Sequence, residues 1–111
     1  MKFKDSSIGL QSLCPQMVLG LIVLDGVFIK HGVEMVITSV NDSKHDEGYS
    51  HYRGMGADIR SKTVVNKEQF INDCKAALGH NPDFYIVLES IGKIWEHFHF
   101  QYKPKRRSYH A

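Results

Sequence analysis

Apolar residues follow a helical period in the first third of the chain. Between about Gln11 and Lys30 they recur every three or four positions, which predicts a helix. Ser12 is a candidate cap for this helix, Pro15 fits its first turn, and Gly32 is a suitable stop. Residues 1–9, by contrast, are mostly polar and predict a short N-terminal arm.

The remaining pattern predicts strands and a second helix. Alternating or β-branched runs predict strands at 33–40, 55–60, 84–88 and 94–102. The second helix starts at Asn66, which forms a capping-box pattern with Gln69, and it ends at Gly79. A polar, glycine-containing loop occupies 41–53. This order predicts an α+β fold, in which helices pack on a small, mostly antiparallel sheet.

Composition adds few constraints to this picture. The chain has 111 residues, 42% of them hydrophobic, which indicates one domain over 1–111 with a basic tail at 103–111. A net charge of +2 is too small to indicate a nucleic-acid partner. Cys14 and Cys74 lie far apart in the sequence, and two buried thiols are favoured over a disulfide.

No segment predicts export or insertion into a membrane. The apolar run from Met17 to Leu24 is too short to span a bilayer, and no small-residue cleavage site follows it. We therefore expect synthesis in the cytoplasm.

Two stretches, 50–60 and 95–102, contain the residues that are the best candidates for metal binding and catalysis. The first places His51 and Asp58 seven positions apart around two glycines, and the second contains Glu96, His97 and His99. Imidazole and carboxylate are good ligands for zinc, and three protein ligands leave an open position, as in catalytic zinc sites. The two stretches together predict a metal site.

These motifs resemble the zinc peptidoglycan peptidases. The runs 44–48, 51–54 and 57–60 are similar to a pattern common in small phage and prophage members, and 96–104 is similar to their terminal strand. That family includes D-Ala-D-Ala carboxypeptidases and L-alanyl-D-glutamate endopeptidases, and the hedgehog signalling domain resembles its fold. The chain departs from the family pattern at Tyr49 and Gly56.

The resemblance implies roles for individual residues. His51, Asp58 and His99 would bind one zinc ion, Glu96 would be the general base, and His97 would lie near the substrate carbonyl. Three further residues are candidates for contacts with the substrate: Arg53, Arg60 and His45. Each has a simpler interpretation as well, such as a packed histidine, a strand-end carboxylate or a solvated arginine.

Strand geometry constrains these roles. Residues an even number apart share a face of a strand, so His97 and His99 should point into one cleft. Glu96 and His99 are an odd number apart, so Glu96 can act as the base only where the backbone is irregular near residues 95–97.

The resemblance implies a monomeric phage or prophage endolysin-type peptidase that cleaves peptidoglycan stem peptides after release from the cell, or is carried in a virion. The sequence leaves open which bond is cut. Two alternatives also stay open, a non-catalytic hedgehog-like zinc-binding module and a metal-stabilised virion structural protein.

Overall fold

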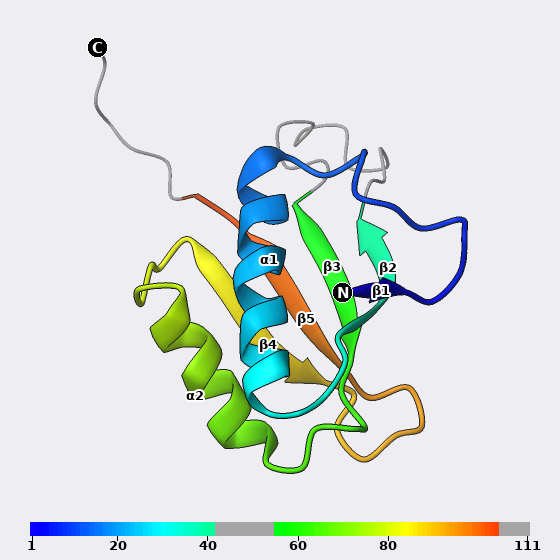
Figure 1. Cartoon of the computed structure of the whole chain (residues 1–111), viewed down its shortest axis with the longest axis vertical. Coiled ribbons are helices and arrows are strands. Elements are labelled where there is room, and N and C mark those ends of the chain that lie inside the picture. The colour runs from blue at the N-terminus through cyan, green and yellow to red at the C-terminus, as the bar shows by residue number, and fades with distance from the viewer. Residues whose placement is uncertain (42–54, 105–111) are drawn as a thin grey trace.

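A five-stranded sheet and two helices form the part of the chain that the structure describes. The structure is a computed structural model, and it describes residues 1–41 and 55–104. Figure 1 shows its elements, whose bounds are β1 Lys2–Phe3, α1 Pro15–Lys30, β2 Val36–Asn41, β3 Gly56–Arg60, α2 Lys67–Ala77, β4 Phe84–Glu89 and β5 His97–Tyr102.

The strands lie in the order β1-β2-β3-β5-β4. The pairs β2–β3, β3–β5 and β5–β4 are antiparallel, whereas β1 pairs with β2 in parallel. The predicted α+β class with a mostly antiparallel sheet is thus confirmed. Part of the expected arm is instead an edge strand, because the amide of Lys2 donates to the Met35 carbonyl at 2.8 Å and that of Lys4 to the Ile37 carbonyl at 2.9 Å.

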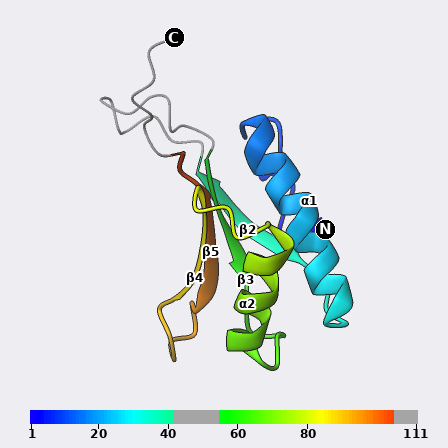
Figure 2. The same cartoon turned by 90° about the vertical axis from the view of Figure 1, so that its left-hand side faces the viewer.

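Both helices cover the same face of the sheet (Figure 2). The buried residues of α1 recur at helical spacing and face the sheet: Met17, Gly20, Leu21, Leu24, Val27 and Phe28. From β5, Phe98 packs against Phe70 of α2, with ring centroids 4.9 Å apart, and against Phe28 of α1 at 6.3 Å. Phe98 therefore joins both helices to strand β5 of the sheet.

Some ends of the two helices match the capping residues predicted from the sequence, and one does not. Asn66 caps α2 by accepting a hydrogen bond from the Gln69 amide at 3.0 Å, which confirms the predicted cap. Gly32 and Gly79 follow α1 and α2 with φ values of 73° and 71°, which glycine adopts without strain. Ser12 was the wrong cap for α1, since Cys14 occupies the N-cap position and makes no side-chain cap bond.

Two of the glycines in α1 have different surroundings. A Cβ atom on Gly20 would lie 2.8 Å from ring atoms of Phe84 and Phe100, so the sheet approaches the helix closely there. A Cβ atom on Gly26 would meet nothing within 4 Å. Close packing against the sheet explains Gly20 and does not explain Gly26.

Both cysteines are free thiols. Cys74 is buried, as predicted, and burial raises its pKa to about 12, while Cys14 is only half-buried. Neither α1 nor α2, in the described part of the chain, is long and apolar enough to cross a membrane.

Candidate functional site

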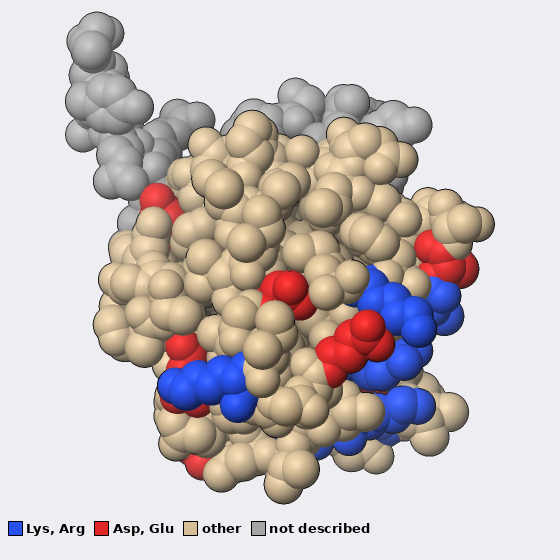
Figure 3. Space-filling view, in the orientation of Figure 1, with Lys and Arg blue, Asp and Glu red and all other residues tan. Residues whose placement is uncertain are grey.

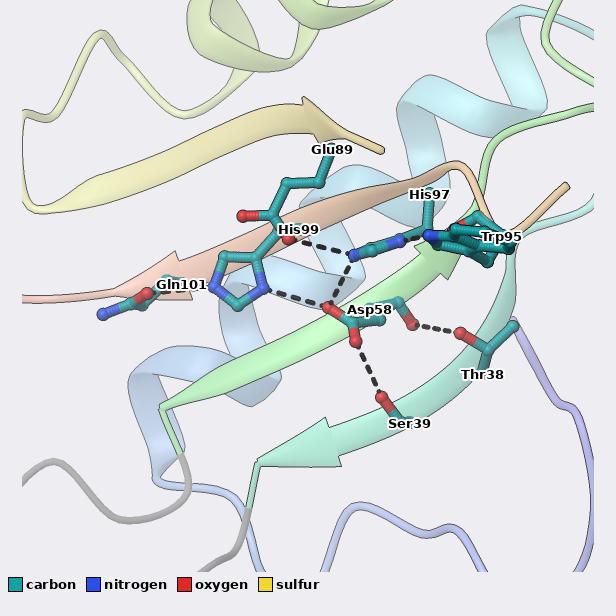
Figure 4. Close-up of polar contacts among 8 residues, drawn as sticks. All are labelled: Thr38, Ser39, Asp58, Glu89, Trp95, His97, His99 and Gln101. Carbon is teal, nitrogen blue, oxygen red and sulfur yellow. Dashed lines mark hydrogen bonds and ion pairs between the residues drawn. The ribbon is translucent and has the colours of Figure 1, made fainter. Parts of the chain in front are cut away.

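The sheet face opposite the helices carries a cluster of acidic and histidine side chains (Figure 4). Phe98 and Phe100 of β5 point into the core, so the alternation of the strand places His97 and His99 on the open face. The predicted shared face of the two histidines is confirmed, but of the two only His97 lines the cleft described below. Strand β3 pairs with β5 so that Asp58 lies directly opposite His99.

Asp58 and His99 form the centre of this cluster. Nδ1 of His99 lies 3.0 Å from Oδ1 of Asp58, and Nε2 lies 3.0 Å from Oε1 of Gln101. Because both neighbours are oxygen acceptors, the imidazole satisfies them by carrying a proton on each nitrogen. The hydrogen bond to Asp58 raises the pKa of His99 to about 9, although burial opposes this effect.

Asp58 is held in its ionised form. Burial alone would raise the pKa of this carboxyl, but hydrogen bonds from His99 and Ser39 outweigh burial and lower the pKa. The Ser39 hydroxyl donates to Oδ2 of Asp58 at 2.9 Å, so each carboxylate oxygen has a partner. The side chain of Asp58 remains one-third exposed at 33%.

His97 contacts the same acidic cluster. Its Nε2 lies 3.0 Å from Oε1 of Glu89 and 3.5 Å from Oδ1 of Asp58, and its Nδ1 lies 2.9 Å from the Trp95 carbonyl oxygen. Burial alone would lower the pKa of His97, but the bond to the Trp95 carbonyl and the charges of Asp58 and Glu89 raise it. The two carboxylates thus stabilise the protonated form of His97.

Asp58, Glu89 and His99 form a possible metal-binding group. Each offers one ligand atom, and these atoms all lie within 4.8 Å of one another. Two carboxylates and one imidazole are a donor set that divalent cations bind. A metal ion that binds a ring nitrogen of His99 would have to displace the proton on that nitrogen. The cluster can therefore hold either a proton or a metal cation on His99.

Two of the three predicted zinc ligands, Asp58 and His99, thus lie side by side. The third, His51, lies outside the described residues, as do the predicted substrate contacts His45 and Arg53. Sequence reasoning did not include Glu89 among the ligands. It ends β4 opposite His97, and only the pairing of β4 with β5 brings it to the cluster.

Glu96 lies just before the first residue of β5. Its amide donates to the Lys93 carbonyl at 3.1 Å, so the backbone turns there and does not continue as a regular strand. Its carboxylate accepts from the Gly92 amide and the Ser61 hydroxyl, each at 3.1 Å, and lies 3.9 Å from Nζ of Lys67. The bond from Gly92, together with that from Ser61, lowers the pKa of Glu96.

An open cleft of about 510 Å³ lies beside this cluster, and Asp58 of the candidate metal group lines it, whereas Glu89 and His99 do not. Arg60, the one predicted substrate contact that the structure describes, lines this cleft together with Asp58, Glu96 and His97. The full lining is Lys4, Thr38, Ser39, Asp58, Arg60, Lys62, Ile94, Trp95, Glu96 and His97. The cleft therefore combines an acidic centre with basic and apolar walls.

Comparisons with known proteins identify no family. No protein-family model, curated protein or solved structure matches the chain significantly. The resemblance to the zinc peptidoglycan peptidases therefore stays a prediction.

Proposed function

We propose that this protein is a zinc-dependent peptidase that hydrolyses peptide bonds in peptidoglycan stem peptides. The observation that supports it most is the pairing of Asp58 with His99. These residues are 41 positions apart in sequence, yet their side chains meet at 3.0 Å on the open face of the sheet. The resemblance requires both residues at one metal, and this contact is consistent with that requirement.

Asp58 and His99 would hold the zinc ion with His51. A bound zinc ion would supply Lewis acidity, which polarises the scissile carbonyl and makes water more acidic. Glu89 is the remaining carboxylate beside these ligands and is a further candidate to bind the metal or to orient His97.

The resemblance and the chemistry of the side chains suggest roles for three other residues, all of which line the cleft. The resemblance would make Glu96 the base that accepts a proton from water and returns it to the leaving amine, a role that its lowered pKa makes it less basic for. His97 would donate a hydrogen bond from Nε2 to the oxyanion that forms at the carbonyl, in place of its present contact with Glu89. Arg60 would bind a carboxylate of the stem peptide.

The contacts of Glu96 also favour a second candidate function. Both of its carboxylate oxygens already accept hydrogen bonds from the 61–67 and 90–96 segments, so Glu96 also holds these segments together. In a non-catalytic zinc-binding module, that structural role would be its whole role.

Mutation of Glu96 separates the two functions. In a peptidase, Glu96→Gln should keep its zinc, measured by metal analysis, while digestion of purified peptidoglycan slows by roughly 10²-fold or more. Ser61→Ala is the matched control, because it removes one hydrogen bond to Glu96 and leaves the carboxylate in place. Glu68→Gln, an exposed carboxylate of α2, controls for the loss of charge.

Further measurements test the metal site and the substrate. His51→Ala, Asp58→Ala and His99→Ala should each lower zinc content, and chelation should lower the melting temperature of the wild type. Masses of the released fragments would identify the bond that is cut. A zinc-loaded wild type that cleaves no bond in peptidoglycan would refute the peptidase and favour the binding module.

A further inference from the structure

Two neighbouring loops expose large apolar side chains at one end of the molecule. They are the segment before α2, residues 61–66, and the segment between β4 and β5, residues 90–96, which lie at the same end in Figures 1 and 2. The Ser61 hydroxyl donates to Glu96 at 3.1 Å, which connects the two loops directly. The exposed side chains, named here the apolar tip, are Val65 (98%), Ile91 (70%), Ile94 (96%) and Trp95 (60%).

The fold does not account for the apolar tip. Its four residues belong neither to the buried core nor to the partly buried residues that pack on that core. Single exposed apolar side chains are ordinary, whereas several at one end of a molecule mark an interaction surface. The Lys93 ammonium lies 5.6 Å from the centroid of the Trp95 ring.

Basic side chains accompany the apolar tip. Lys62 and Lys93 are exposed in the same two loops, and Lys67 follows at the start of α2. Within residues 61–67 and 90–96 the three lysines are accompanied by one acidic residue, Glu96, whose carboxylate lies 3.9 Å from Nζ of Lys67, and two further carboxylates, Glu68 and Glu89, lie next to these segments. Figure 3 shows Lys and Arg side chains gathered toward the edge of the molecule where β1 and the 90–96 loop lie.

We propose that the apolar tip docks on the surface of an anionic lipid bilayer. Isoleucine, valine and tryptophan side chains enter the headgroup region favourably, and neighbouring lysines bind the anionic headgroups. Charge complementarity favours an anionic bilayer as the partner. The exposed apolar side chains of the tip lie in segments 61–67 and 90–96, which contain more lysines than acidic residues. Docking of this kind is attachment at the surface and is distinct from spanning the membrane.

Docking by the apolar tip would also determine where the cleft lies relative to the membrane. Ile94 and Trp95 of the tip also line the cleft that contains Asp58 and His97. A protein docked by its tip would therefore hold the cleft at the membrane surface. The proposal does not depend on catalysis, since a binding module with the same tip would dock in the same way.

Trp95 makes the docking directly measurable, because it is the only tryptophan in the chain. The full-length protein would be titrated with vesicles of phosphatidylcholine, with and without phosphatidylglycerol. We expect the Trp95 emission to shift to shorter wavelength, and brominated acyl chains to quench it, with the anionic vesicles. High salt should weaken the binding, because it screens the lysines from the lipid charge.

Four variants and a control locate the docking surface. Val65→Asp and Ile91→Asp, which lie outside the cleft lining, should each weaken vesicle binding by about tenfold or more. Lys62→Glu and Lys93→Glu should each weaken it by roughly five-fold or more, the scale expected for one lysine at an anionic surface.

The matched control is Ile29→Asp on the exposed side of α1, where the isoleucine is 69% exposed. It should leave vesicle binding unchanged, and circular dichroism should show that all variants fold. Unchanged Trp95 emission with anionic vesicles would overturn the proposal, as would equal loss of binding in Ile29→Asp. Self-association that Ile91→Asp abolishes, without vesicle binding, would also overturn it and assign the tip to a second copy.

Discussion

The pairing of Asp58 with His99 predicts a specific dependence of stability on pH in the metal-free protein. Asp58→Asn keeps the size of the side chain and its contact with Ser39, but removes the charge that faces His99. The variant should therefore lose the stabilisation that comes from a protonated His99 beside a carboxylate.

The pKa of His99 sets the magnitude and the pH range. A rise in the pKa of His99 from 6.5 to about 9 corresponds to about 3 kcal/mol of free energy of unfolding. Since Asp58 is one-third exposed, screening by solvent reduces our expectation to about 1–2 kcal/mol. A raised histidine pKa stabilises the folded state fully below 6.5, and this stabilisation is lost as the pH rises through about 9.

Asp58 sets the acidic limit of the effect. Its pKa is lowered from 3.8, so its contribution is present above that value and is lost as the pH falls through the folded-state pKa. The difference in unfolding free energy between wild type and Asp58→Asn should thus be largest between about pH 4 and 6.5.

Urea unfolding in excess chelator measures this difference. At about pH 6 the wild type should be more stable than Asp58→Asn by about 1–2 kcal/mol, and at about pH 9.5 most of that difference should disappear. Ser39→Ala is the control, because it removes a hydrogen bond from a hydroxyl that does not titrate to an Asp58 that is ionised at both pH values, and it should cost about 1 kcal/mol at both. An equal difference at both pH values for Asp58→Asn would show that a charged pair does not form.

Three other substitutions test the packing and capping of the helices. Gly20→Ala should destabilise the protein by about 1–3 kcal/mol, because its Cβ would lie 2.8 Å from the rings of Phe84 and Phe100. Gly26→Ala, in the same helix with open space around it, should instead stabilise by about 0.5–1 kcal/mol. Asn66→Ala should cost about 1 kcal/mol by removing the cap of α2. Chemical denaturation measures all three, and destabilisation by Gly26→Ala comparable to that by Gly20→Ala would contradict the packing argument.

The predictions that the structure confirms come from local rules. An Asn side chain can cap a helix with its own neighbours, so Asn66 was identifiable before any tertiary contact was known. Alternation along β5 likewise predicted that His97 and His99 share a face. Such rules need only the positions of adjacent residues, and they located both helices and four of the strands to within a few residues.

Features that depend on distant pairing were not predictable in the same way. The edge strand β1 exists because Lys2 and Lys4 bond to the Met35 and Ile37 carbonyls, and two residues show no periodicity of their own. The place of Glu89 beside the histidines depends on the register of β4 with β5. A shift of that register by one residue would turn the side chain to the other face.

Glu96 shows how a local rule and a tertiary contact combine at the site. The odd separation from His99 required an irregular backbone, and β5 indeed begins only at His97, after a turn closed by the Glu96 amide and the Lys93 carbonyl. The same turn brings the carboxylate to Ser61, in a segment 35 positions earlier in the sequence. Glu96 therefore links the wall of the cleft to the apolar tip, so its replacement should be examined for loop structure as well as for turnover.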